Sequence, residues 1–509
     1  MVQIKPRANY TSPGDTLVLE DETGRVLLAA GALPAGGGAF PLPALTQVLV
    51  TGVVVVVRGR VLPSGELSVT DFSVPGLGGG PPPRALPAPG AAPPTYALLL
   101  SDLEAGVAAG VGETARLPLA LLVEWVAGLS GGGGGAGVAA GRVARVVIAG
   151  GLVGVLPERR AAAAAAAGGG GASSGGAVSA SFTDARAVTA AEQEAVVQSL
   201  RAADVFLSQL AAACDVDLMP GPGDPSNHSL PQLPLHPSQL PLSARFSTLH
   251  WATNPFEAEV GGARLLGTSG QNVADVVRYA AASTVLAPGG EVGAVARGGG
   301  GAPAAAAEMS AEELAAAAVS ELAREGEGGG DEGGGGEEGG EGGGGGGAGS
   351  AILARATGGT SGDKALAMLA GTGAGAGAEA RLAADTGGAA ASEAAVAASL
   401  NPLHVLTNTL FWRHMAPTAP DTLPCFPFSG GDPFVIDALP HLYFAGGQPG
   451  FGSAWVAAPG CGAGGTRVVA VPSFAKTGAG VLVDLSSPTL RCTPLCFAAG
   501  GTATGLRTL

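Results

Sequence analysis

The feature that most constrains this chain is a long low-complexity stretch, residues 288–399, that separates two parts able to fold. It contains the run EGEGGGDEGGGGEEGGEGGGGGG and several Ala-rich pieces. Glycine and alanine bury too little apolar surface to offset the conformational entropy that a chain loses on ordering. We therefore predict that this Gly/Ala/Glu-rich stretch is a disordered insertion, and that one domain continues on either side of it.

Most of the negative charge lies in the same region. Residues 284–400 hold 16 acidic and five basic residues, a net charge of −11, so the rest of the chain carries about −4 of the total −15. The parts able to fold are therefore close to neutral, and they lack the basic stripe with which a protein binds phosphate groups. Strong, independent binding to DNA is not expected.

No segment has the pattern of a membrane span or a secretory signal. The most apolar run, residues 48–57, is about half as long as a transmembrane helix, and the first residues lack the apolar stretch of a signal peptide. The five cysteines form no CxxC pair and have no zinc-ligand spacing. These features favour reduced thiols in the cytosol or the nucleus, and no contact with a membrane.

Residues 1–75 have the pattern of a small all-β domain. Short apolar runs at 16–20 and 25–29, a long β-branched run at 47–62, and the turn before 67–74 predict about four antiparallel strands, with no helix between them. An OB-fold barrel is the simplest such domain, although it has five strands. The pattern indicates that the domain begins before Met1. A Pro/Gly-rich linker at 76–95 follows.

The rest of the foldable chain alternates between strand and helix patterns. This alternation predicts a layered α/β domain in two parts, residues 96–287 and 400–509. The predicted strands are 96–100, 143–149, 216–219 and 442–445, the predicted helices are 117–127, 189–213 and 405–414, and a hairpin is predicted from 468–471 and 481–485.

Four of the strand ends carry short motifs that resemble, in order, those of two-metal phosphoesterases of the calcineurin type. The motifs are Asp102-Leu103-Glu104, Gly150-Gly151, Gly221-Pro222-Gly223-Asp224 and Gly446-Gly447-Gln448. Such enzymes hold two ions about 3.5–4 Å apart with ligands at converging strand ends. Here most ligand positions have lost their Asp or His, at Glu104, Gly151 and Gln448 above all. We therefore predict a vestigial site without metal, cofactor or catalysis, in which Asp102 and Asp224 are remnants.

Other polar residues offer weaker candidates. His228 and His236 lie in a Pro-rich loop, residues 220–241, which is more typical of a rigid turn than of a ligand set. Ser269 lies in a turn that resembles a nucleophile turn, but it lacks the GxSxG spacing. Leu233 and Leu235 of the Pro-rich loop are candidate contacts for a protein partner; packing of the loop on its own domain is an equally open alternative.

Several long segments together resemble one family, the small (B) subunits of eukaryotic DNA polymerase delta. The resemblance covers most of the foldable chain, although the long acidic insertion is not part of the family's pattern. The segments are MPGPGDPSNHSLPQLPLHPSQLPLS (219–243), TNPFEAEVGGARLLGTSGQNVADVVRY (253–279), MAPTAPDTLPCFPF (415–428), DPFVIDALPHLYFAGGQPGFGS (432–453) and VLEDETGR (18–25).

The resemblance implies a fold and a role. The fold would be an OB-fold barrel packed on an inactivated calcineurin-like phosphoesterase domain. The role would be that of a nuclear scaffold subunit that binds the C-terminal module of the polymerase's catalytic subunit and a third accessory subunit, and through them the sliding clamp and primer-template DNA. The alternatives are an active metal-dependent phosphoesterase or nuclease, like the small subunits of archaeal D-family polymerases, and a B subunit of polymerase alpha or epsilon.

Overall fold

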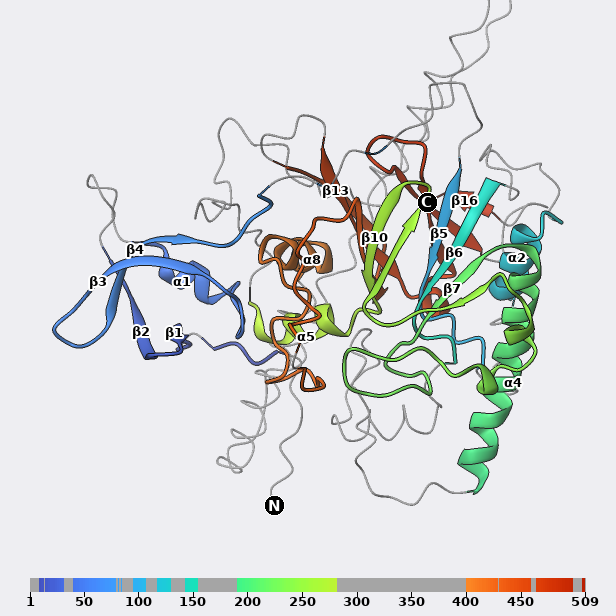
Figure 1. The fold of residues 1–509 in the computed structure, drawn as a ribbon, viewed down its shortest axis with the longest axis horizontal. Coiled ribbons are helices and arrows are strands. Elements are labelled where there is room, and N and C mark those ends of the chain that lie inside the picture. The colour runs from blue at the N-terminus through green and yellow to red at the C-terminus, as the bar shows by residue number, and fades with distance from the viewer. Residues whose placement is uncertain are drawn as a thin grey trace, which may run out of the picture. The chain divides into compact units, whose positions relative to one another are not determined.

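The computed structural model describes residues 9–12, 14–31, 40–78, 81, 84, 95–106, 117–129, 142–153, 190–281, 400–428, 430–458, 464–497 and 506–508. The predicted insertion at 288–399 and most of the predicted linker at 76–95 lie outside these residues. Figure 1 shows the described elements, which are labelled in chain order.

The N-terminal part contains a four-stranded sheet with the strand order β1-β2-β4-β3. Its strands are β1 (Val18–Asp21), β2 (Gly24–Ala30), β3 (Val56–Val61) and β4 (Leu67–Ser73). The predicted hairpin is confirmed, because β3 and β4 pair antiparallel across the turn at 62–66.

Two predictions for this sheet are wrong. The run from Gln47 to Val55 is not a strand: a short helix, α1 (Leu42–Thr46), comes before it, and Gly52 breaks the run with a φ of +86°, a conformation that glycine adopts readily. In addition, β2 and β4 pair parallel rather than antiparallel. A parallel pair needs a long crossover connection, and residues 31–66, with α1 and β3, supply it.

A seven-stranded sheet forms the first layer of the larger part, with the order β16-β15-β14-β5-β6-β7-β8. Its central strands are mostly apolar, as expected for strands buried on both faces. Helices α2 (Leu117–Val126) and α4 (Ala190–Ala213) cover one face, where Leu122 and Leu207 pack with Ile148. The strands are β5 (Tyr96–Leu100), β6 (Val143–Ala149), β7 (Val216–Met219), β8 (Leu249–Trp251), β14 (Ala479–Asp484), β15 (Cys492–Phe497) and β16 (Leu506–Thr508).

A five-stranded sheet with the order β12-β13-β11-β10-β9 packs on the other face of the first. Leu99 and Val147 of the first sheet share one apolar core with Leu265 and Phe444 of the second. Helices α5 and α8 contact each other, and α8 contacts β11, β12 and β13, which gives a layered α/β/β/α arrangement (Figure 1). The elements are β9 (Phe256–Val260), β10 (Ala263–Thr268), β11 (Leu442–Gln448), β12 (Gly452–Ala457), β13 (Gly465–Pro472), α5 (Gln271–Tyr279) and α8 (Pro402–Phe411).

The predicted hairpin between residues 468–471 and 481–485 is wrong. β13 pairs with β11 and β12, whereas β14 pairs with β5 and β15 in the other sheet. A short helix, α9 (Phe474–Thr477), connects the two strands. Both strands have a mostly apolar and buried centre, which suits central strands of two stacked sheets better than a half-exposed hairpin.

The N-terminal sheet shares an apolar core with the second part of the α/β region. Val69 and Phe72 belong to the same buried cluster as Leu410. Beside that cluster, the guanidinium group of Arg413 donates from Nε to the carbonyl of Gly76 (2.8 Å) and from Nη2 to that of Gly78 (3.0 Å). Arg413 thus fastens the start of the predicted linker to the end of α8.

Among the described helices, none combines the length and the apolar character needed to cross a membrane.

Candidate functional site at the converging strand ends

The strand ends singled out from the sequence lie together in the structure. Asp102, after β5, donates its backbone N–H to the carbonyl of Gly150, after β6, at 2.9 Å. Gly447, near the end of β11, approaches the same point: a Cβ placed on it would lie 3.4 Å from Oδ2 of Asp102. Gly221, after β7, and Ser269, after β10, also lie against Gly150. The carboxyl ends of β5, β6, β7 and β11 therefore meet at one point, as predicted. The carboxyl end of β10 reaches the same point, so both sheets contribute.

Asp224 does not face an open site. Its carboxylate is buried and accepts three backbone hydrogen bonds, from Gly151 (2.8 Å) and Gly221 (2.9 Å) at Oδ2 and from Val153 (2.9 Å) at Oδ1. Burial raises the pKa of this carboxyl group, and the backbone hydrogen bonds act in the opposite direction. Asp224 thus joins the loop after β7 to the loop after β6, a task that shared metal ions perform in a two-metal site.

Asp102 and Glu104 adopt an unusual backbone conformation. Their φ angles are +46° and +47°, in the left-handed region that non-glycine residues seldom adopt. Burial, followed by the negative charge of Glu104, raises the pKa of Asp102 to about 6. A bound cation would have the opposite effect on this carboxyl group. The negative charge of Glu104 therefore disfavours the ionised form of Asp102.

Glycine backbone fills the space where the strand ends meet. A Cβ on Gly150 would lie 2.7 Å from Cα of Gly221, and a Cβ on Gly221 would lie 2.6 Å from the backbone nitrogen of Gly151. On Gly446, a Cβ would lie 2.6 Å from the carbonyl oxygen of Ala149. Two ions about 3.5–4 Å apart with their ligands need a cavity at this point, and the backbones approach too closely to leave one.

The side chains of the site do not form a metal-ligand set. Within the described residues, no group of three or more His, Cys, Asp and Glu side chains is placed to hold a metal ion. Gln448 occupies the last motif, and its side-chain amide donates to the carbonyl of Gly446 at 2.6 Å. These residues therefore do not fit the pair of ions that the motif order would imply.

Ser269 also belongs to this site, which the sequence motifs did not predict. Ser269 follows β10, and a Cβ placed on Gly150 would lie 2.7 Å from the Cβ atom of Ser269. Its hydroxyl group accepts a hydrogen bond from Nδ2 of Asn254 (2.7 Å) and contacts Gln271. The partners are amides rather than a histidine, so the geometry does not support a nucleophile. The position directly after an apolar strand was the available signal.

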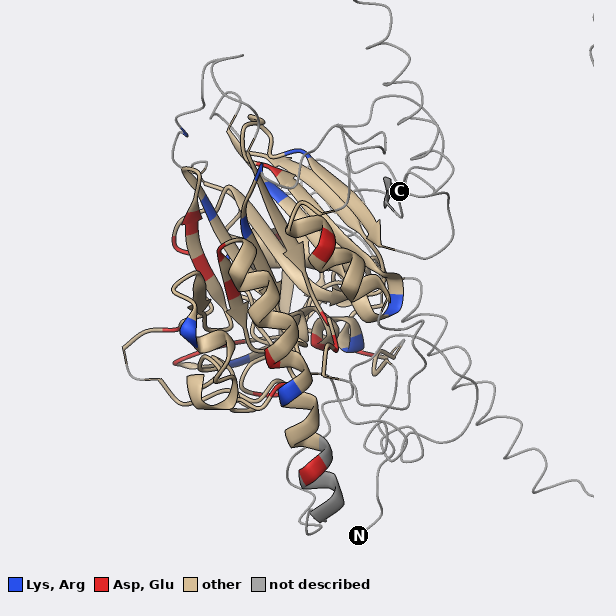
Figure 2. Cartoon of the chain, turned by 90° about the vertical axis from the view of Figure 1, so that its right-hand side faces the viewer, with Lys and Arg blue, Asp and Glu red and all other residues tan. Residues whose placement is uncertain are grey.

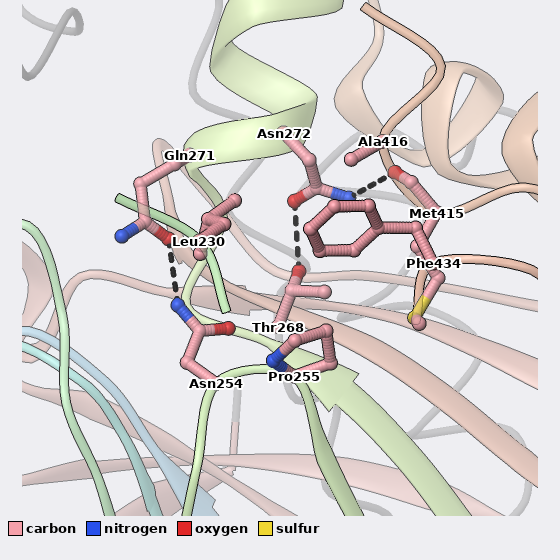
Figure 3. A pocket seen from close by; sticks show the side chains of 9 residues that line it. All are labelled: Leu230, Asn254, Pro255, Thr268, Gln271, Asn272, Met415, Ala416 and Phe434. Atoms are coloured by element: carbon pink, nitrogen blue, oxygen red, sulfur yellow. Dashed lines mark hydrogen bonds between the residues drawn. The ribbon is translucent and has the colours of Figure 1, made fainter. Parts of the chain in front are cut away.

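The amide network around Ser269 borders a small cavity. Figure 3 shows Nδ2 of Asn254 donating to Oε1 of Gln271 (3.0 Å), and Thr268 donating to Oδ1 of Asn272 (2.9 Å). Phe434 and Met415 close the apolar side. The cavity has a volume of about 10 Å³, which is room for a single water molecule. It is too small for an organic substrate.

His236, a weaker candidate from the Pro-rich loop, and His441 accept backbone hydrogen bonds and have structural roles. Nδ1 of His236 accepts the backbone N–H of Ser238 at 3.2 Å and caps a short 3₁₀ helix (Pro237–Gln239). At the start of β11, Nδ1 of His441 accepts the N–H of Arg264 at 2.9 Å. His228 lies in the Pro-rich loop, and the structure does not place it in a metal-ligand group.

The two leucines proposed as partner contacts differ in position. Leu235 is only 1% exposed and belongs to the core under α2 and α4, so its prediction as a surface contact is wrong. The Pro-rich loop folds back so that Leu235 completes that apolar core. Leu233 is 63% exposed, and its role as a contact remains a prediction.

Comparisons with known proteins agree on one family. Residues 106–453 match a family model that describes the B subunits of DNA polymerases alpha and epsilon. Residues 1–72 match a model described as the DNA polymerase delta subunit OB-fold domain. The second match confirms the predicted OB-fold at the N-terminus.

Among curated relatives, the DNA polymerase delta small subunit of Oryza sativa subsp. japonica is 26% identical over 97% of this chain and 76% of its own length. The DNA polymerase delta small subunit of Arabidopsis thaliana is also 26% identical, over 97% of this chain and 75% of its own length. DNA polymerase delta subunit 2 of Drosophila melanogaster is 27% identical over 97% of this chain and 76% of its own length. The chain therefore belongs to the B-subunit family of replicative DNA polymerases, with the small subunits of DNA polymerase delta among its relatives.

Proposed function

We propose that this chain is a non-catalytic subunit of a DNA polymerase delta complex and that it acts as a scaffold in DNA strand elongation. The observation that carries the proposal is similarity along almost the whole chain, 97% of it, to proteins named as delta small subunits. A match restricted to one domain would support a shared fold only. A match across both the N-terminal sheet and the α/β region supports a shared role.

The strand-end site supports the non-catalytic part of the proposal. The α/β/β/α layers and the order of the strand-end motifs fit a calcineurin-like phosphoesterase domain that has lost its activity. The carboxylate of Asp224, one of the two remnants, accepts hydrogen bonds from three backbone N–H groups. The other, Asp102, belongs to no group of three or more His, Cys, Asp and Glu side chains that is placed to hold a metal ion within the described residues.

The proposed partners are the C-terminal module of the delta catalytic subunit and a third accessory subunit. Contact with the sliding clamp and with primer-template DNA would be indirect, through these partners. Figure 2 supports this view for the side that it shows, where Lys and Arg residues in the described chain are few and separated. Strong binding to DNA depends on clustered phosphate contacts. The site of action would be the nucleus.

We also propose the domain limits given by the sequence pattern. These are an OB-fold domain at 1–75, a linker at 76–95 and one phosphoesterase-like domain made of 96–287 and 400–509, with an insertion at 288–399, which lies outside the described residues. Arg413 and the shared apolar core support a firm junction between the first and last of these folded parts.

The proposal is tested by co-expression of the full chain with the delta catalytic subunit of the same organism. We expect the two proteins to elute together at equal stoichiometry in size-exclusion chromatography. Co-elution with the alpha or epsilon catalytic subunit in place of delta would refute the assignment to delta. Elution of the chain alone in all three experiments would refute the scaffold role.

A further inference from the structure

One short surface segment presents several large apolar side chains to solvent. Within residues 424–436, Phe426 is 46% exposed, Phe428 is 45% exposed and Val435 is 43% exposed. Single exposed apolar residues are common on soluble proteins, but three within one short segment are not scattered in this way. Phenylalanine is also among the residue types enriched at protein interfaces.

Hydrogen bonds and ring contacts hold this segment in place. The carbonyl of Pro424 accepts the N–H of Leu230 at 2.9 Å, and the N–H of Phe426 donates back to the carbonyl of Leu230 at 2.8 Å. The ring of Phe428 packs edge-on against the buried ring of Phe434, with centroids 6.3 Å apart. A surface that is ordered before binding loses little conformational entropy when a partner docks.

The far end of the segment is fixed as well. Oδ1 of Asp432 accepts the N–H of Phe434 at 2.8 Å, and its Oδ2 lies 2.9 Å from Nε2 of His414. The short loop that carries Val435 is therefore tied to the residues that follow α8. Both ends of the exposed segment are therefore hydrogen-bonded to other parts of the domain.

The charge of this region is mostly negative. Residues 413–440 contain three acidic residues, Asp421, Asp432 and Asp437, and one basic residue, Arg413, whose Nη1 donates to the carbonyls of Ile436 (3.2 Å) and Asp437 (3.3 Å). Asp421 and Asp437 are exposed, on either side of the phenylalanines in the sequence. Interfaces are arranged so that opposite charges meet. A partner that fits this surface presents apolar side chains flanked by Lys or Arg.

We propose that Phe426, Phe428 and Val435 form a docking surface for a basic, apolar segment of another subunit of the polymerase complex. We call these three side chains the Phe426 surface. The proposal rests on the proposed function, because that function supplies a stable protein partner. It adds which face of the chain binds and what chemistry the partner segment must have. Leu233 is exposed on the same loop as Leu230, the residue to which this segment is hydrogen-bonded.

The test uses a double variant, Phe426→Glu with Val435→Glu, in the full chain. Phe428 is left intact, because it packs on the buried ring of Phe434. The matched control is Val197→Glu with Val205→Glu on α4, where the side chains are 39% and 47% exposed and the charge change is the same. Both variants and the native chain are titrated separately with the purified delta catalytic subunit and with the third accessory subunit of the same organism.

We expect the double variant to bind one of these two subunits at least about tenfold more weakly, with an unchanged melting temperature, and the control to bind normally. Asp421→Lys should also weaken the same interaction and reduce its dependence on NaCl between about 0.05 and 0.3 M. A photo-crosslinking phenylalanine analogue at position 426 should yield a partner peptide that contains Lys or Arg beside apolar residues.

The outcomes separate the two proposals. A native chain that binds neither subunit contradicts the proposed function. Native binding that the double variant retains contradicts the Phe426 surface and leaves the function standing. A native chain that self-associates through position 426, shown by a crosslink to a second copy, also overturns the docking proposal. If the double variant melts lower, Phe426→Ser alone is used, and retained binding of that variant is a contradiction as well.

Discussion

Replacement of Asp102 by Asn should stabilise the protein at neutral pH. The carboxyl group is buried beside Glu104, and its pKa of about 6 lies above the ordinary value of 3.8. Because the folded protein holds this proton more tightly than the unfolded chain, the favourable contribution is complete below pH 3.8 and is lost as the pH rises through about 6. At neutral pH the folded protein therefore carries an unfavourable buried charge, which Asn removes.

The size of the effect follows from the shift. One pKa unit corresponds to about 1.4 kcal/mol, so the difference between 3.8 and about 6 gives roughly 3 kcal/mol above pH 7. At pH 5, where the group is still mostly protonated in the folded state, the gain falls to about 1.5 kcal/mol. Asn has nearly the same shape as Asp, so packing should change little.

The measurement is urea unfolding of the native chain and the variant at several pH values between about 5 and 8. Asp421→Asn, an exposed carboxylate, serves as the control and should change stability by less than about 0.5 kcal/mol. A stability gain for Asp102→Asn that does not grow with pH would refute the reasoning. So would stabilisation by added Mn²⁺ that the native chain shows and the variant lacks, because that pattern belongs to a metal ligand.

Three further predictions concern the packing of the domain. Asp224→Ala should cost roughly 3 kcal/mol or more in urea unfolding, because three buried backbone N–H groups lose their acceptor; a cost below about 1 kcal/mol would contradict this role. Gly150→Ala should be much more destabilising than Gly65→Ala. Both glycines have a positive φ, but a Cβ on residue 150 would lie 2.7 Å from Cα of Gly221, whereas a Cβ on residue 65 would meet nothing within 4 Å. Equal melting temperatures of the two variants would refute the close approach at Gly150. Arg413→Ala should lower the melting temperature and speed proteolysis near residue 78, because its guanidinium no longer holds the linker; unchanged cleavage would show that the apolar core alone holds the junction.

The parts of the fold that the sequence predicted best are the buried central strands. The limits of β6 and β7, Val143–Ala149 and Val216–Met219, were predicted correctly. Each is a mostly apolar run, with one charged residue (Arg145 in β6, Asp217 in β7), and Gly150 or Pro220 follows its last residue, so local composition defines that end. Such strands are stabilised by burial on both faces, and that signal is contained in the run itself.

Predictions failed where pairing between distant residues decides the structure. The apolar runs within β13 and β14 are close in sequence, which favours a hairpin. The pattern does not predict that the two strands, separated by α9, belong to different sheets. The run at 47–55 has high β propensity, yet Val48 and Val50 pack into the core near α1 without joining a ladder, and Val54 is exposed. Propensity is overridden by tertiary context in both cases.

The candidate site was predictable in its motifs but not in its packing. The motif order correctly placed Asp102, Gly151 and Asp224 at one point, because parallel strands end at the same edge of a sheet. It did not show that backbone N–H groups satisfy Asp224, or that Ser269 joins the site from β10. Leu233 and Leu235 are alike in sequence, and the opposite exposure of these two side chains depends on how the loop folds back.

The central claim is that the strand-end site holds no metal ion and catalyses no reaction. The most direct test is to incubate the purified full chain with Mn²⁺, to measure bound metal after gel filtration, and to assay hydrolysis of a generic phosphodiester and of single-stranded DNA. We predict no bound metal and no turnover above the background of a buffer control. Bound Mn²⁺ together with hydrolysis that disappears in Asp102→Ala would contradict the account.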